Sequence, residues 1–165
     1  MQSFQITAQK DFMNQLLTGE LFEMFFLKEA NIVTGVSYHI DGHRNLAYYK
    51  DVNENQSENV EENMNIYIPF REMRSILFQM IKGKRTPLSF HIILHLDKTE
   101  VNHFLKEHGT TVQQSFVSNL VLNIRFDDNG MQVISAVDYS DFTLDKEIEK
   151  KWDQKVASML ALHLG

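Results

Sequence analysis

The stretch from Pro69 to Leu96 constrains the fold most, because a helix, a stop signal and a strand follow one another there without ambiguity. Pro69 suits the start of a helix, where its missing N–H costs no hydrogen bond. Gly83 is expected to end the helix in a left-handed conformation, which glycine adopts without strain. Between them, apolar residues recur at the three- and four-residue spacing of one helical face: Phe70, Met73, Ile76, Leu77, Met80 and Ile81.

The apolar period changes from about 3.6 to 2 after Pro87. This alternation predicts a strand that turns one apolar face to a core and one largely polar face to the other side of a sheet. The apolar set is Leu88, Phe90, Ile92, Leu94 and Leu96, and it alternates with Ser89, His91, Ile93 and His95.

Two dipeptides predict β-hairpins elsewhere in the chain. Asp41-Gly42 and Asn129-Gly130 suit two-residue turns, which need positive φ angles. The strand that returns from the first turn is expected to contain Leu46, Tyr48 and Tyr49.

Three more helices are expected from cap and stop residues. The first runs from a cap at Thr7 to Gly19, the second from Asp97 to Gly109, and the last begins at a Thr143 cap. The last helix is predicted to bury one stripe of side chains: Leu144, Ile148, Trp152, Val156, Met159, Leu160 and Leu164.

Length and charge distribution indicate one domain. A chain of 165 residues is long enough for a single core. Five acids and no Lys or Arg lie between residues 51 and 63, and removing these five negative charges from the net charge of -6 leaves -1. The sequence therefore predicts one α+β domain over residues 1–165, with a mainly antiparallel sheet, two hairpins, about four helices and a mobile acidic loop at 51–63.

The chain contains no cysteine, which excludes disulfides, thiolate metal sites and cysteine nucleophiles. Its first residues lack the apolar run of a signal peptide, and no stretch of about 18 apolar residues suits a membrane span. We therefore expect a cytoplasmic protein with no membrane partner.

Four short segments and one tryptophan carry a resemblance to known sequences: Ile40-Asp41-Gly42, Ile81-Lys82-Gly83-Lys84 continuing into Thr86-Pro87-Leu88-Ser89-Phe90, Leu122-Asn123-Ile124-Arg125-Phe126, and Phe142-Thr143-Leu144-Asp145-Lys146 with Trp152. They resemble landmarks of an uncharacterised bacterial family of unknown function, over nearly the whole chain. The resemblance implies a single-domain architecture. It brings no activity, cofactor or partner with it.

The polar side of the predicted sheet offers one candidate ligand-binding site. His91 and His95 lie on one strand, and Asn123 and Arg125 alternate on another. Arg125 suits an anion and a histidine suits acid or base work. The two histidines are about 13 Å apart along a strand, too far to share one ion. The simpler interpretation is that this face is only solvated.

No metal or cofactor is predicted. His39, Asp41 and His43 have ligand chemistry, but a turn at Asp41-Gly42 would place His39 on the opposite strand face. The pair Glu100 and His103 has di-iron spacing, but the second helix that such a site needs is missing from the sequence.

A second candidate is an interaction patch just beyond the central helix. Lys82 lies where it complements the helix dipole, whereas Lys84 and Arg85 follow the expected glycine stop. These last two are expected to bind an acidic partner surface or phosphates.

The leading hypothesis is a non-enzymatic intracellular module that binds a protein partner or an anionic ligand, because each catalytic constellation fails on geometry or number. One alternative is a small-molecule-binding domain or enzyme that uses the polar sheet face with His91, His95 and Arg125. The other is a nucleic-acid-associated protein, since the element order of the first half is similar to a sliding-clamp domain. Five cations favour that alternative: Arg71, Arg74, Lys82, Lys84 and Arg85.

Overall fold

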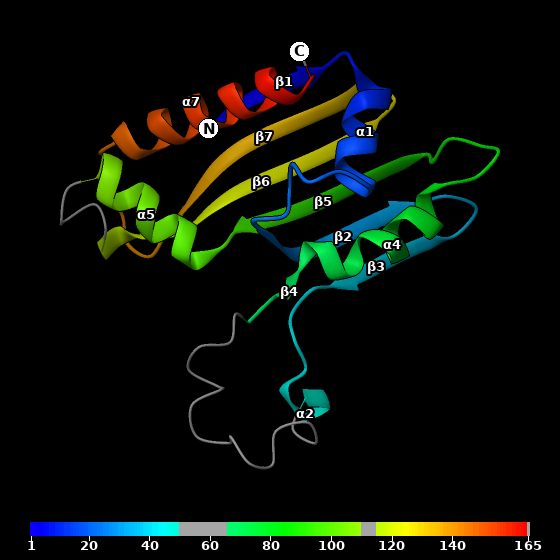
Figure 1. Cartoon of the computed structure of the whole chain (residues 1–165), viewed down its shortest axis with the longest axis horizontal. Helices are drawn as coiled ribbons and strands as arrows, with labels where there is room; N and C mark the ends of the chain where they lie inside the picture. Colours follow the sequence, from blue (N-terminus) through cyan, green and yellow to red (C-terminus); the bar gives the residue numbers. More distant parts are fainter. Residues whose placement is uncertain (50–65, 110–114, 165) are drawn as a thin grey trace.

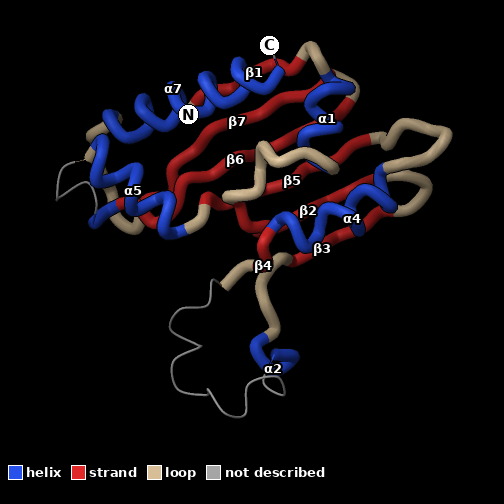
Figure 2. Tube along the Cα trace, viewed as in Figure 1, coloured by secondary structure: helices blue, strands red, loops and turns tan. Residues whose placement is uncertain are grey.

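Seven strands form one antiparallel sheet, and helices cover one face of it in a computed structural model that describes residues 1–49, 66–109 and 115–164 (Figures 1 and 2). The predicted α+β domain with a mainly antiparallel sheet is therefore confirmed. The predicted acidic loop at 51–63 lies outside the described residues.

The sheet has the strand order β1-β7-β6-β5-β2-β3, and β4 pairs with β2. The strands are β1 (Gln2–Ile6), β2 (Phe25–Val33), β3 (Ser37–Asp41), β4 (Ile68–Pro69), β5 (Ser89–Leu96), β6 (Val117–Asp127) and β7 (Gly130–Tyr139). The helices are α1 (Gln9–Leu17), α2 (Leu46–Tyr49), α4 (Phe70–Ile81), α5 (Lys98–His108) and α7 (Glu147–Leu164).

The core lies between the sheet and helices α1, α4, α5 and α7 (Figure 1). Strand β5 turns its predicted apolar face to this core, with Phe90, Ile92, Leu94 and Leu96 buried. Helix α4 begins directly after Pro69, as predicted, and buries Phe70, Leu77 and Ile81. In α7 the predicted stripe is buried at Ile148, Trp152, Val156 and Leu160.

Trp152 ties α7 to the sheet. Its ring is 1% exposed, its Nε1–H donates to the Val121 carbonyl oxygen at 3.1 Å, and it packs edge-on against Phe104 of α5 at 5.9 Å between ring centroids. One side chain therefore joins two helices and a strand.

The prediction of a first hairpin at Asp41-Gly42 is wrong. Strand β2 turns into β3 earlier, through Thr34, Gly35 and Val36, where the Thr34 N–H donates to the Val36 carbonyl oxygen at 2.8 Å. The expected returning strand at 46–49 is instead the short helix α2.

Gly42 is needed for a close backbone approach. Strand β2 has a register shift between Leu27 and Glu29, and the Gly42 N–H donates to the carbonyl oxygen of the intervening Lys28 at 2.9 Å. A Cβ on Gly42 would lie 1.8 Å from the Leu27 carbonyl oxygen. A glycine is therefore required at position 42, but the requirement comes from the close contact with this bulge and not from a turn.

The second predicted hairpin is confirmed. Strands β6 and β7 turn between Asp127 and Gly130, which pair with each other, and Gly130 has a φ of 101°. The Asn129 N–H donates to the Asp127 Oδ1 at 2.7 Å. This pattern is a turn followed by a left-handed glycine.

Several helix ends differ from the prediction. Gly83 does not have a positive φ angle. Helix α4 is followed instead by Lys82 in an extended conformation. Ala8, not Thr7, precedes α1. Helix α7 begins at Glu147, whose N–H donates to the Asp145 Oδ1 at 2.9 Å, so Thr143 is not its cap. Leu144 therefore lies before the helix and is exposed instead of buried.

We predict that Gly42→Ala destabilises the protein by about 3 kcal/mol or more, because the new methyl group would overlap backbone that the β2 bulge holds in place. Chemical denaturation measures the free energy of unfolding. Gly35→Ala is the matched control, because a Cβ there meets nothing within 4 Å. It should change stability by less than about 1 kcal/mol. Equal effects of the two substitutions would show that the close approach at Gly42 is absent.

Candidate ligand-binding groove and polar sheet face

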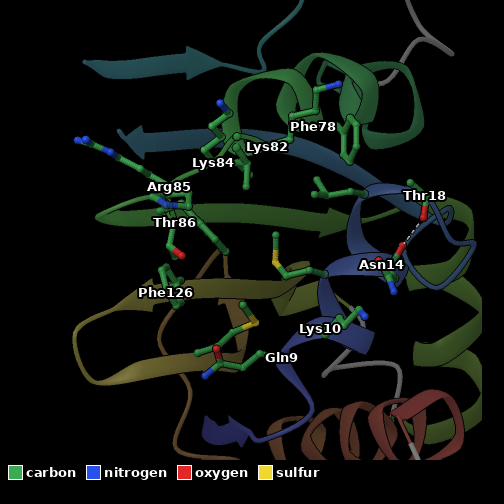
Figure 3. Close-up of a pocket in the computed structure, with 17 residues that line it drawn as sticks. Gln9, Lys10, Asn14, Thr18, Phe78, Lys82, Lys84, Arg85, Thr86 and Phe126 are labelled. Carbon is green, nitrogen blue, oxygen red and sulfur yellow. Dashed lines mark hydrogen bonds between the residues drawn. The ribbon is translucent and has the colours of Figure 1, made fainter. Parts of the chain in front are cut away.

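A cavity of about 620 Å³ opens on the helix-covered side of the sheet, between α1, the C-terminal end of α4 and the loop from α4 to β5 (Figure 3). Strands β5, β6 and β7 supply its floor through one side chain each: Phe90, Phe126 and Met131. We call this cavity the groove.

The floor and inner walls of the groove are apolar. The rings of Phe90 and Phe126 stack at 5.3 Å between centroids. Four of the apolar lining residues, Leu17, Ile81, Phe90 and Met131, are buried, and three, Met13, Phe78 and Phe126, are half-buried and partly open to the cavity.

The rim of the groove is cationic. Lys10 comes from α1, and Lys82, Lys84 and Arg85 come from the loop after α4. Among the described residues that line the groove there is no Asp or Glu, so the lining carries +4 in a chain whose net charge is -6. The lining of this opening is therefore positively charged.

The four cations that line the groove are exposed. In residues 1–49, 66–109 and 115–164, none of them forms a salt bridge with an acidic group. Lys82 Nζ lies over the Phe78 ring at 5.2 Å from its centroid, and Figure 3 shows Arg85 extending away from the hollow. The charges of Lys10, Lys84 and Arg85 are free to meet a ligand.

The predicted patch of Lys84 and Arg85 thus lies at the mouth of a cavity. The sequence did not reveal Lys10 as their neighbour, because it is on α1 and about 75 residues away along the chain. The apolar periodicity of the first helix was visible, but it could not distinguish Met13 facing a cavity from Met13 filling a core.

The polar sheet face brings three of the four predicted residues together. His91 pairs directly with Arg125 across β5 and β6, and its Nε2 lies 3.4 Å from the Asn123 Oδ1. Burial, and after it the charge of Arg125, lowers the pKa of His91. These residues lie on the side of the sheet opposite α1, α4, α5 and α7.

His95 is separate from the other three. It is 4% exposed and packs at 5.2 Å between ring centroids against Tyr67, and the side chain of Asn119 lies close enough to favour its protonated form. Its Nε2 is 3.7 Å from the Asp138 Oδ2. Burial lowers the pKa of His95 and the charge of Lys28 adds to this, while Asp138 opposes it. The four predicted residues therefore do not form one site.

His39, Asp41 and His43 line one hollow of about 330 Å³ with Lys28, Glu29 and Tyr67. The strand-face argument against their convergence was wrong, because β3 continues through Asp41 and places His39 and Asp41 on the same face. The His39 Nδ1 instead lies 2.6 Å from the Asn31 Oδ1. Within the described part of the chain, no three His, Asp or Glu side chains are grouped so that they could hold a metal ion.

Comparison with known proteins gives a family and no activity. The model of a family described as a family of unknown function (DUF5721) matches residues 15–163. No curated protein and no solved structure matches the chain. Among the described residues, no helix is long and apolar enough to cross a membrane.

We predict that His95→Leu makes the protein less sensitive to acid. Because the pKa of His95 is lower in the folded state than in the unfolded chain, the unfolded state binds the proton more readily, and stability present above about pH 6.5 is lost as the pH falls below it. Leucine suits a buried apolar site, so the variant should be within about 1 kcal/mol of wild type at neutral pH.

The measurement is the melting temperature from pH 7.5 to pH 5. As the pH falls, the melting temperature of wild type should decrease more than that of His95→Leu. The melting temperature of His103→Gln, which changes an exposed histidine, should decrease as much as that of wild type. Parallel curves for all three proteins would show that His95 is not buried as described.

Proposed function

Because the chain belongs to this family of unknown function (DUF5721), whose description names no activity, we propose from its geometry that the protein is a non-enzymatic module that binds an anionic ligand carrying an apolar group. One observation supports this most: an apolar cavity is ringed by four cations and no acid in a chain with a net charge of -6. The ligand would place its apolar group on the floor and its anionic group at the rim.

The floor supports the apolar half of this proposal. The cavity volume of about 620 Å³ falls within the range of about 300 to 1,000 Å³ that small-ligand sites occupy. Each Å² of apolar surface removed from water contributes about 25 cal/mol. Met13, Phe78 and Phe126 are only half-buried, so a ligand that covers them would gain this contribution.

The rim supports the anionic half. Lys10, Lys82, Lys84 and Arg85 are among the residues that line the cavity, so their combined field attracts an anion and increases the association rate. An arginine also offers a carboxylate or phosphate two parallel hydrogen bonds.

The lining favours binding over catalysis. Among the described lining residues there is no His, Asp, Glu or Tyr to serve as an acid or base near neutral pH. The Thr18 hydroxyl already donates to the Asn14 carbonyl oxygen at 2.8 Å. The absence of cysteine in the chain is compatible with a reducing compartment, and we place the module in the cytoplasm.

A second candidate is the polar sheet face, where His91, Asn123 and Arg125 are adjacent. Arg125 is exposed and suits a small anion, so this face remains an alternative ligand site. The groove is preferred, because it combines an apolar floor with a larger positive charge. For the nucleic-acid alternative, Arg74 is less accessible than expected, since it donates to the Gly19 carbonyl oxygen and pairs with Glu23 at 3.6 Å.

We predict that the groove binds the fluorescent probe anilinonaphthalene sulfonate, and that Lys84→Gln combined with Arg85→Gln weakens this binding about threefold to thirtyfold through loss of two charge contacts. The uncharged N-phenyl-naphthylamine has the same rings without the sulfonate, so its affinity should be unchanged. Fluorescence titration measures both affinities, and near-UV circular dichroism confirms that each variant is folded, because partly unfolded proteins also bind such probes.

Two further variants locate the site. Met13→Gln keeps the side-chain length but makes the floor polar, so it should weaken both probes. Lys98→Gln combined with Lys106→Gln removes two exposed cations of α5, which is not part of the groove, and should weaken neither. If the sulfonate probe binds the rim variant as tightly as wild type, the groove is not the anion site.

A further inference from the structure

Residues 141–145, between β7 and α7, expose two large apolar side chains. Phe142 is 81% exposed and Leu144 is 83% exposed. The residue between them, Thr143, is half-buried, and the flanking Asp141 and Asp145 are exposed. Such a run of Asp-Phe-Thr-Leu-Asp presents two apolar groups between two carboxylates.

The segment lies outside the regular elements of the fold, since residues 142–146 belong to no helix or strand. Local hydrogen bonds shape it: the Phe142 N–H donates to the Asp141 Oδ1 at 2.8 Å, and the Asp145 N–H donates to the Thr143 Oγ1 at 3.1 Å. Phe142 and Leu144 are therefore exposed on one short connection, with a carboxylate on either flank.

This segment has the chemistry that the groove requires of a ligand. The groove has half-buried apolar side chains at Met13, Phe78 and Phe126 and a rim of four cations without an acid in the described lining. The segment has the reverse charge and two apolar side chains that lack cover in the described molecule. Covering them would remove apolar surface from water on both partners.

The segment cannot reach the groove of its own molecule. Figure 1 shows the connection from β7 to α7 at one end of the long axis, beside α5, whereas the loop from α4 to β5 lies at the other end. Strand β7 and helix α7 run the length between them. Any contact between segment and groove must therefore join two molecules.

We propose that the groove of one molecule binds residues 141–145 of a second copy, with Phe142 and Leu144 on the floor and Asp141 and Asp145 facing the cationic rim. This inference rests on the proposed function, since it identifies the anionic ligand of that site. Each molecule then offers one segment at one end and one groove at the other. Such a head-to-tail contact produces open chains or closed rings instead of a two-fold dimer.

The test is sedimentation of the full chain over a range of concentrations. Wild type should increase in mass as its concentration rises. Phe142→Ser combined with Leu144→Ser should weaken self-association at least about tenfold, because two apolar anchors are lost. The rim variant Lys84→Gln with Arg85→Gln should also weaken it. Leu162→Ser is the matched control, because Leu162 is 82% exposed but lies outside both surfaces.

Mixing the two double variants tests the head-to-tail geometry. The segment variant keeps an intact groove and the rim variant keeps an intact segment, so a mixture can form one contact and cannot grow beyond two molecules. We expect particles of twice the monomer mass in the mixture and monomers in each variant alone. A mixture that stays monomeric while wild type assembles would overturn the inference, as would assembly that either double variant leaves unchanged.

A synthetic peptide of residues 139–147 separates this inference from the proposed function. It should displace anilinonaphthalene sulfonate from the groove, and the same peptide with serine at positions 142 and 144 should not. If the probe binds the groove as predicted but the peptide does not displace it, and wild type stays monomeric up to about 1 mM, the self-recognition is wrong and the proposed function stands. Failure of the probe itself would remove the proposed function.

Discussion

Burial of a single face of the antiparallel sheet is the interaction on which the rest of the structure depends. Helices α4 and α7 lie over opposite halves of the sheet (Figure 1). Helices α1 and α5 lie between these halves, at opposite ends of the long axis. This helix layer supplies most of the cover, with Leu21 and Phe22 from the connection between α1 and β2 added to it, so the placement of the helices decides where cover is incomplete. The groove lies where α1 and the end of α4 leave Phe90 and Phe126 without a helix above them. The polar residues of β5 and β6 are left on the opposite face.

Much of the fold followed from local patterns. Helix α4, strand β5 and the turn before Gly130 were predictable, because in each the periodicity and the stop or turn residue agree. The first hairpin was not, because Gly42 serves a contact with the Leu27 carbonyl oxygen that is distant in sequence. A glycine required by a neighbouring strand cannot be distinguished from a turn glycine by its local sequence alone.

The site was predictable only in its charged part. Lys84 and Arg85 were predicted to form an interaction patch because they follow the helix end, where capping does not require them. The apolar floor comes from α1, β5, β6 and β7, and every one of its residues also fits an ordinary core position. Whether such a residue faces a cavity depends on how distant elements pack. His95 illustrates the same limit, because alternation placed it on a polar face while Tyr67 covers it.

The position of Trp152 gives the molecule a convenient optical property. It is the only tryptophan in the chain. It belongs to α7, and its N–H donates to the Val121 carbonyl oxygen of the sheet. The described residues that line the groove include no Trp or Tyr. Indole emission therefore reports whether α7 is docked on the sheet and is insensitive to direct contact at the groove. Indole emission of the protein without a probe therefore follows the docking of α7 on the sheet.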